Sequence, residues 1–148
     1  MFRNLKYLKD IIKNYWLNHK MIYDIKFGDT DNLSIYHDLQ YPLVNYEYID
    51  SNYRAGNENV VRFQFSIMDL TVEEDVEMDF DVVANMNEIA NDFLKWLEDH
   101  NDIEIQPNVS LQPFSDSFGD RVSGVTFTVS FNIYRNNCMG ILPHQSND

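Results

Sequence analysis

The sequence predicts an α+β domain in which an antiparallel sheet of about four strands, arranged as two hairpins, packs against two helices. Two segments carry apolar residues at helical spacing, and several others alternate between apolar and polar residues as half-buried strands do. Their order along the chain is helix, strand pair, helix, strand pair, which favours helices on one face of an antiparallel sheet. The length of 148 residues fits a single domain, 1–148.

Both helices follow from the spacing of apolar residues. The first is expected at residues 2–18, where lysines separate Phe2, Leu5, Leu8, Ile12, Tyr15 and Trp16. The second is expected over Asp81–Asp99, after a run of acidic residues. Acids at a helix N-terminus interact favourably with the helix dipole, at about 0.3–1 kcal/mol each in the first turn. Its apolar stripe consists of Val83, Met86, Ala90, Phe93, Leu94 and Leu97.

The first hairpin is expected between the two helices. A short strand at Ile22–Phe27 precedes a strand at Leu43–Ile49, and a long polar loop is predicted at Asp50–Asn59. The next strand, Val60–Met68, alternates along its whole length. Its inward side chains are Val61, Phe63, Phe65 and Ile67.

The second hairpin follows the second helix. A strand is expected at Ile103–Leu111 and a polar loop at Pro113–Gly124. The strand Val122–Tyr134 shows the clearest alternation, with Val125, Phe127, Val129, Phe131 and Ile133 inward and Thr126, Thr128, Ser130 and Asn132 outward. Residues 136–148 are expected to form an irregular tail.

Charge is unevenly distributed. Residues 1–26 hold six cations and two anions, a local charge of +4, whereas the rest holds five cations and 22 anions, a charge of −17. The acidic body should repel nucleic acid, since affinity there comes mainly from neutralised phosphates. No apolar run approaches the ~20 residues of a membrane span, and residues 1–20 lack the apolar core of a signal peptide. A single cysteine excludes an internal disulfide and favours synthesis in a reducing cytoplasm.

No catalytic or cofactor-binding residue is predicted. His100 and Asp102 form the nearest approach to an acid–base pair, but such a pair at a helix end is typical of a cap. Ser123 before Gly124 lacks the strand–turn–helix context of a hydrolase nucleophile. Cys138 has no neighbouring base in the sequence. The chain is therefore predicted not to be an enzyme, and no metal or cofactor is assigned.

Two acidic pairs leave an alternative open. Asp79 with Asp81, or Asp29 with Asp31, could supply oxygen ligands to a hard cation such as Mg²⁺ or Ca²⁺. Neither pair has the glycine and final glutamate of an EF-hand loop. The favoured interpretation is a solvated loop and a helix N-terminus.

Tyrosines and charged segments suggest contacts with other proteins. Tyr is common at interfaces because it offers rigid area with a polar tip, although it also lines core faces of strands. The basic helix Phe2–Lys20 is interpreted as a docking arm that can be removed without unfolding the chain. The loops Asp50–Asn59 and Gln112–Ser123 are further candidate contacts. The clustered tyrosines are Tyr36, Tyr41, Tyr46, Tyr48 and Tyr53.

The segment from Leu111 to Cys138, LQPFSDSFGDRVSGVTFTVSFNIYRNNC, resembles the C-terminal hairpin of small virion proteins of tailed phages, including crAss-like phages. The layout from Leu43 to Leu97 is similar to that of tail-completion and tail-terminator proteins, so the resemblance covers about residues 40–140. Its most specific part is Pro113–Phe114, Phe118, Asp120 and Gly124 before the alternating strand and Cys138.

The resemblance implies a tail-terminator-like fold and a structural subunit that forms a homo-oligomeric ring at the head–tail junction (neck or connector) or in the tail. The partners would then be copies of itself and neighbouring head–tail or tail proteins, in a virion assembled in the host cytoplasm. Genome DNA would pass through the ring without specific binding. The alternative is a small acidic module that inhibits or binds a basic protein.

Overall fold

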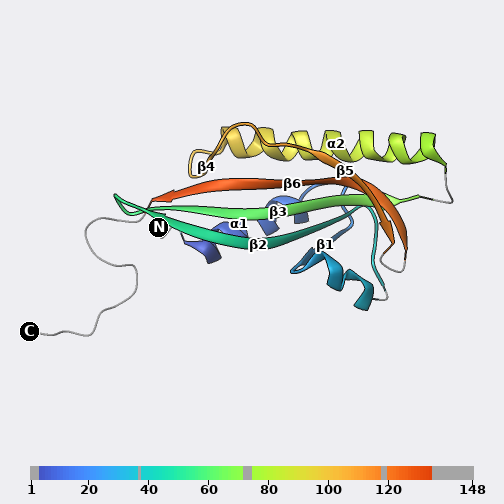
Figure 1. Cartoon of the computed structure of the whole chain (residues 1–148), viewed down its shortest axis with the longest axis horizontal. Coiled ribbons are helices and arrows are strands. Elements are labelled where there is room, and N and C mark those ends of the chain that lie inside the picture. The colour runs from blue at the N-terminus through green and yellow to red at the C-terminus, as the bar shows by residue number, and fades with distance from the viewer. Residues whose placement is uncertain (1–3, 37, 72–74, 118–119, 135–148) are drawn as a thin grey trace, which may run out of the picture.

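The chain forms one mixed sheet with helices on it (Figure 1). The computed structural model describes residues 4–36, 38–71, 75–117 and 120–134. The elements are α1 (Leu5–Leu17), β1 (Asp24–Phe27), the 3-10 helix η1 (Thr30–Ile35), β2 (Leu43–Arg54), β3 (Glu58–Leu70), α2 (Val76–Asp99), β4 (Glu104–Ile105), β5 (Gln112–Ser117) and β6 (Arg121–Tyr134).

The described part of the sheet has six strands, so the prediction of about four was too small. The strands run in the order β1, β2, β3, β6, and both β4 and β5 pair with the far edge of β6. The two expected hairpins are present as β2–β3 and β5–β6. The short first strand runs parallel to β2, whereas an antiparallel sheet was expected. The α+β class is confirmed, with a mostly antiparallel sheet.

The prediction of a long loop at Asp50–Asn59 is wrong. β2 continues to Arg54 and β3 begins at Glu58, so the turn is short and Tyr53 pairs with Asn59. Polar residues such as Ser51 and Asn52 have low strand propensity, but pairing with β3 outweighs that weak preference.

The second predicted loop, Pro113–Gly124, is also wrong. It contains β5 and the start of β6, with Pro113 opposite Val125 in the ladder. The strand expected at Ile103–Leu111 shrinks to two residues, Glu104–Ile105, because β5 takes over the pairing with β6. A proline fits β5 because β5 is an edge strand.

The second helix begins at Val76, five residues before the predicted Asp81. Asp75 caps it, since its side chain accepts a hydrogen bond from the backbone N–H of Met78 at 3.2 Å. Glu77 and Asp79 lie in the first turn, where the helix dipole favours them. The acidic run is therefore partly inside the helix rather than only before it.

One face of the sheet carries the main core. The inward side chains predicted for β3 and β6 are buried there, except that Ile133 at the end of β6 is only partly buried. α2 covers this face with a stripe in which Met86, Ala90, Phe93 and Leu97 are buried. The alternation predicted for these strands is confirmed.

The first helix packs into the same core. Its side chains Leu8, Ile12 and Trp16 are buried, and the Trp16 ring lies 4.7 Å from that of Phe93 on α2. The expectation that residues 1–20 form a removable arm is therefore wrong, because their removal would take three core side chains from the domain. Residues 1–3 lie outside the described part.

A smaller apolar cluster lies on the opposite face at one end of the sheet. Leu33 of η1 packs there with Leu43, Met68 and Val122. The loop between β1 and β2 thus covers this corner, and the side chain of Asn45 holds it by donating to the Gly28 carbonyl at 2.9 Å.

Gly124 is required by the close approach of β6 to β3. A Cβ added at Gly124 would lie 1.9 Å from the carbonyl oxygen of Ile67 and 2.8 Å from its carbonyl carbon. These are backbone atoms of the paired strand, so the ladder itself would have to move.

We predict that Gly124→Ala lowers the free energy of unfolding by about 3 kcal/mol, the upper end of the usual cost of overpacking. The control is Gly56→Ala in the β2–β3 turn, where a Cβ meets nothing within 4 Å but φ is +85°. Its expected cost is only about 1–2 kcal/mol. Urea denaturation measures both, and equal losses would contradict the close approach.

Candidate assembly surfaces

The sheet is longer than the helices that cover it. The 13 residues of α1 span about 20 Å, whereas the 12 residues of β2 span about 40 Å. In Figure 1 the β2–β3 turn and the end of β6 extend beyond the last turn of α2. The helix-covered face is therefore bare at the hairpin end.

Apolar side chains remain exposed on this bare end. Tyr48 is 42% exposed and Tyr53 is 65% exposed. In the strand register, Tyr53 lies in one row with Asn59 and the partly buried Ile133. Tyr48 also contacts the buried Phe63, with ring centroids 5.7 Å apart. The bare end is thus a direct continuation of the core.

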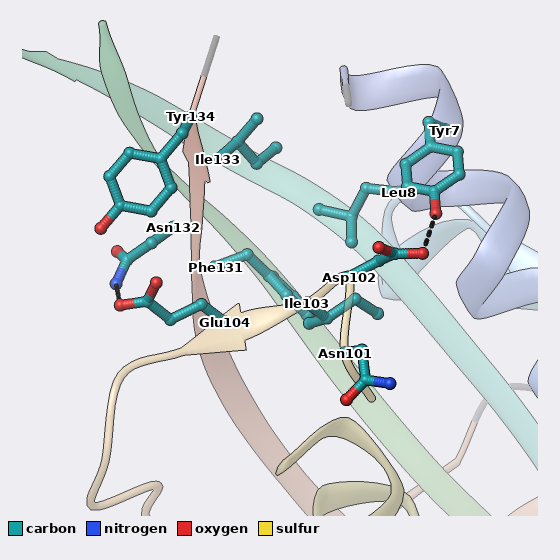
Figure 2. Close-up of a pocket in the computed structure, with 10 residues that line it drawn as sticks. All are labelled: Tyr7, Leu8, Asn101, Asp102, Ile103, Glu104, Phe131, Asn132, Ile133 and Tyr134. Carbon is teal, nitrogen blue, oxygen red and sulfur yellow. Dashed lines mark hydrogen bonds between the residues drawn. The ribbon is translucent and has the colours of Figure 1, made fainter. Parts of the chain in front are cut away.

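A small cavity of about 100 Å³ lies between α1, the segment after α2 and the end of β6 (Figure 2). Leu8, Ile103, Phe131 and Ile133 supply its apolar walls. Polar groups surround these walls: the hydroxyl of Tyr7 donates to the carboxylate of Asp102 at 3.3 Å, and the amide of Asn132 donates to that of Glu104 at 3.2 Å. The cavity therefore lies at the edge of the sheet and has an acidic rim, with Asp102 on the helix side next to Tyr7 and Glu104 on the polar side next to Asn132.

Carboxylates near the cavity also change the pKa of Tyr134. A hydrogen bond to Glu58, burial, and the nearby charge of Glu104 raise the pKa of Tyr134 to about 12. We call Tyr48, Tyr53 and Ile133 with the cavity and its carboxylates Asp102 and Glu104 the hairpin-end surface.

The outer edge of β2 is unpaired within the described residues at the same end. β1 pairs with β2 only at residues 43–46, which leaves residues 48–54 with one free side. Exposed strand edges are usually protected by prolines or lysines. β5 has Pro113 and β1 has Lys26, whereas residues 48–54 contain neither residue type.

The exposed side of α1 is basic. Lys6, Lys13 and Leu17 lie on one stripe of the helix, and Leu17 is 60% exposed. Asp10 is on the same stripe, and Lys9 lies beside it with its ammonium 4.7 Å from the ring centre of Phe27. We call this stripe the basic face of α1.

A shallow groove of about 590 Å³ separates α1 from the end of α2. Its aromatic walls are Tyr15 and Trp96, whose ring centroids lie 4.7 Å apart, and His100 packs 5.0 Å from Trp96. Burial and the charge of Asp92 raise the pKa of Tyr15 to about 12. The groove is the second partly apolar concavity of the helix layer.

The sheet face opposite the helices is polar beyond the cluster around Leu33. The outward residues predicted for β6, Thr126, Thr128, Ser130 and Asn132, point to this side. Arg62 is held by Asp50 at 2.8 Å, so its charge is matched. This arrangement lowers the pKa of the Asp50 carboxyl through the hydrogen bond to the guanidinium. The strand register also places Glu47 and Glu104 on this face, opposite Gln64 and Asn132, so the face is polar and slightly acidic.

The His100–Asp102 pair is joined through the backbone. The backbone N–H of Asp102 donates to Nδ1 of His100 at 3.2 Å. The pair thus closes the turn after α2, while the Asp102 carboxylate points to Tyr7 instead. This geometry has the form of the cap that the sequence favoured.

The acidic pairs are separated into different roles. Asp79 accepts hydrogen bonds from the guanidinium of Arg121 at 3.0 Å and from the hydroxyl of Ser123 at 3.2 Å. Asp29 caps η1 by accepting from the N–H of Asp31 at 2.9 Å. Among the described residues no three acidic, histidine or cysteine side chains gather as a metal site would require.

Ser123 is buried and takes part in this same network. Its hydroxyl lies 2.8 Å from that of Ser115 on β5. Ser123 therefore joins the start of α2 to the β5–β6 hairpin. Cys138 lies outside the described residues.

The clustered tyrosines divide between core and surface. Tyr46 is buried, and Tyr41 packs on the Leu33 cluster and donates to Asp120 at 3.1 Å. Tyr36, Tyr48 and Tyr53 are exposed. The core interpretation is confirmed for Tyr46, and the interface interpretation of the exposed tyrosines stays a prediction.

The acidic rim was not predicted as a unit. Asp102 and Glu104 come from the segment after α2, Ile133 comes from β6, and Tyr7 comes from α1. No local spacing in the sequence marks them, because pairing of distant strands brings them together. The sequence indicated only that the chain after residue 26 is acidic as a whole.

No protein-family model matches the chain, and no curated protein matches it. Within the described residues, no helix combines the length and apolar character needed to cross a bilayer.

We predict that Asp79→Asn destabilises the domain by about 1–2 kcal/mol, because it weakens a partly exposed ion pair and a buried hydrogen bond to Ser123. Asp81→Asn, two residues along the same helix and exposed, is the control and should cost less than about 0.5 kcal/mol. Thermal unfolding measures both. A loss at Asp81 as large as that at Asp79 would contradict this role.

Proposed function

We propose that the protein is a structural subunit that closes head to tail into a ring, at the head–tail junction or in the tail of a phage virion. The observation that carries the proposal is the hairpin-end surface, where the core face of the sheet continues beyond its helices. Exposed apolar surface that continues a core is typical of a protein–protein contact.

A closed ring needs two unlike surfaces that meet around an axis. The hairpin-end surface is acidic at its rim, whereas the exposed side of α1 is basic. The two differ in shape and in charge, as a head-to-tail contact requires. A twofold dimer, by contrast, would need a single self-complementary patch.

The polar face of the sheet suits the lumen of such a ring. Its central side chains on β6, Thr126, Thr128 and Ser130, are small and uncharged, and the charges around them include the ion pairs Arg62–Asp50 and Arg54–Glu58. A body with a charge of −17 repels DNA, which allows a genome to pass without being held. The virion setting rests on the resemblance of residues 111–138 to tailed-phage proteins, a segment that forms β5 and β6 as far as Tyr134.

The experiment is to measure the mass of the full chain in solution by light scattering over a range of concentrations, with electron microscopy of the largest species. We expect a ring. The removal of Tyr48 and Tyr53 (Tyr48→Ser with Tyr53→Ser) should weaken its assembly about 10–100-fold, since buried interface aromatics carry much of the binding energy.

Tyr23→Ser is the matched control. Tyr23 is 70% exposed, similar to Tyr53, but it precedes β1 at the opposite end of β2. The proposal is contradicted if the control variant loses the ring to the same extent. It is also contradicted if the wild-type chain stays monomeric and binds a basic protein in a salt-sensitive way. The second outcome would favour the acidic inhibitor module instead.

A further inference from the structure

We infer that the hairpin-end surface receives the basic face of α1 from a second copy of the chain. The inference rests on the proposed ring and names the two surfaces that form its contact. Both surfaces are exposed on the same subunit, and each has the charge that the other lacks.

The hairpin-end surface offers an apolar floor within an acidic rim. The cavity of about 100 Å³ has the size of one side chain, and its walls Leu8, Ile103 and Phe131 suit the methylene stem of a lysine. Asp102 and Glu104 both line the cavity, and Figure 2 shows their carboxylates on opposite sides of Phe131, Asp102 toward Tyr7 and Glu104 toward Asn132. Either carboxylate can meet the ammonium group of that lysine.

The basic face of α1 carries the complementary groups. Lys6 and Lys13 are seven residues apart on the helix and therefore project from one side, about 10 Å apart along the axis. Leu17 continues the stripe with an exposed apolar side chain that Tyr53 or Tyr48 of the neighbour can cover. Three lysines against one aspartate leave the stripe positive even with Asp10 included.

A second copy is the partner that these charges select. The chain outside residues 1–26 is strongly acidic, so two copies repel each other unless their basic segments take part in the contact. The basic face is on the solvent side of α1, whereas the cavity is on its buried side, where Leu8 lines it, so each copy carries both surfaces. This is the condition for a head-to-tail ring.

The test uses two charge-reversed full-length chains. One carries Lys6→Glu and Lys13→Glu, and the other carries Asp102→Lys and Glu104→Lys. Each alone should associate roughly tenfold or more weakly than the wild type, because like charges then face each other. An equimolar mixture should recover assembly, since the reversed surfaces of one variant match those of the other.

The controls reverse exposed charges on α2, Lys95→Glu and Glu88→Lys, and should assemble as the wild type does. Thermal unfolding confirms that each variant is folded. The pairing of these two surfaces is wrong if the wild type and both reversed variants form rings. It is also wrong if the wild type forms rings but the mixture does not recover assembly. Neither of these results contradicts the ring itself. A wild type that remains monomeric at all concentrations overturns the ring and the pairing together.

Discussion

The structure depends on a mismatch between its long strands and the part of them that its helices cover, since α1 is short and α2, although about 36 Å long, stops short of the β2–β3 turn (Figure 1). A strand rises more than twice as far per residue as a helix, so the 13-residue α1 covers only about half of a 12-residue strand. β2, β3 and β6 pair along most of their length and form a continuous ladder. The core can be completed over the middle of the sheet, but its apolar face necessarily runs on beyond the cover.

The consequences of this mismatch extend to the distribution of charge. The cover that does exist is asymmetric: α1 presents lysines to solvent, while the segment after α2 presents Asp102 and Glu104 beside the uncovered strands. Acidic groups around an apolar opening favour a basic partner over an acidic one, as the proposed contact requires. In the proposed assembly, the end of the sheet that the helices leave uncovered is also the surface that makes the contact.

Much of the fold could be predicted from the sequence where one face of an element is buried. The alternation in β3 and β6 and the helical stripe around Phe93 reflect such burial directly, and the structure confirms them. Residues 50–54 and 112–117 were mistaken for loops, since both faces of an edge or overhanging strand are polar and carry no alternation. Their strand structure comes from pairing with β3 and β6, which is a tertiary effect.

The candidate surfaces were less accessible to prediction for the same reason. The exposed Tyr53 and the basic character of α1 could be predicted from composition alone. The cavity could not, because Tyr7, Glu104 and Ile133 are brought together from three regions of the chain. The buried side of α1 also could not be separated from a docking side, since Trp16 and Leu17 both fit an apolar stripe.

The most direct measurement of the central claim is hydrogen–deuterium exchange of the full chain at dilute and concentrated conditions. The claim is that the uncovered hairpin end is buried by assembly. Amides of residues 48–54, which have a free edge in the monomer, should then exchange more slowly as the assembly forms, while those of Asp24–Phe27 stay unchanged. Assembly with unchanged exchange at residues 48–54 would contradict the account.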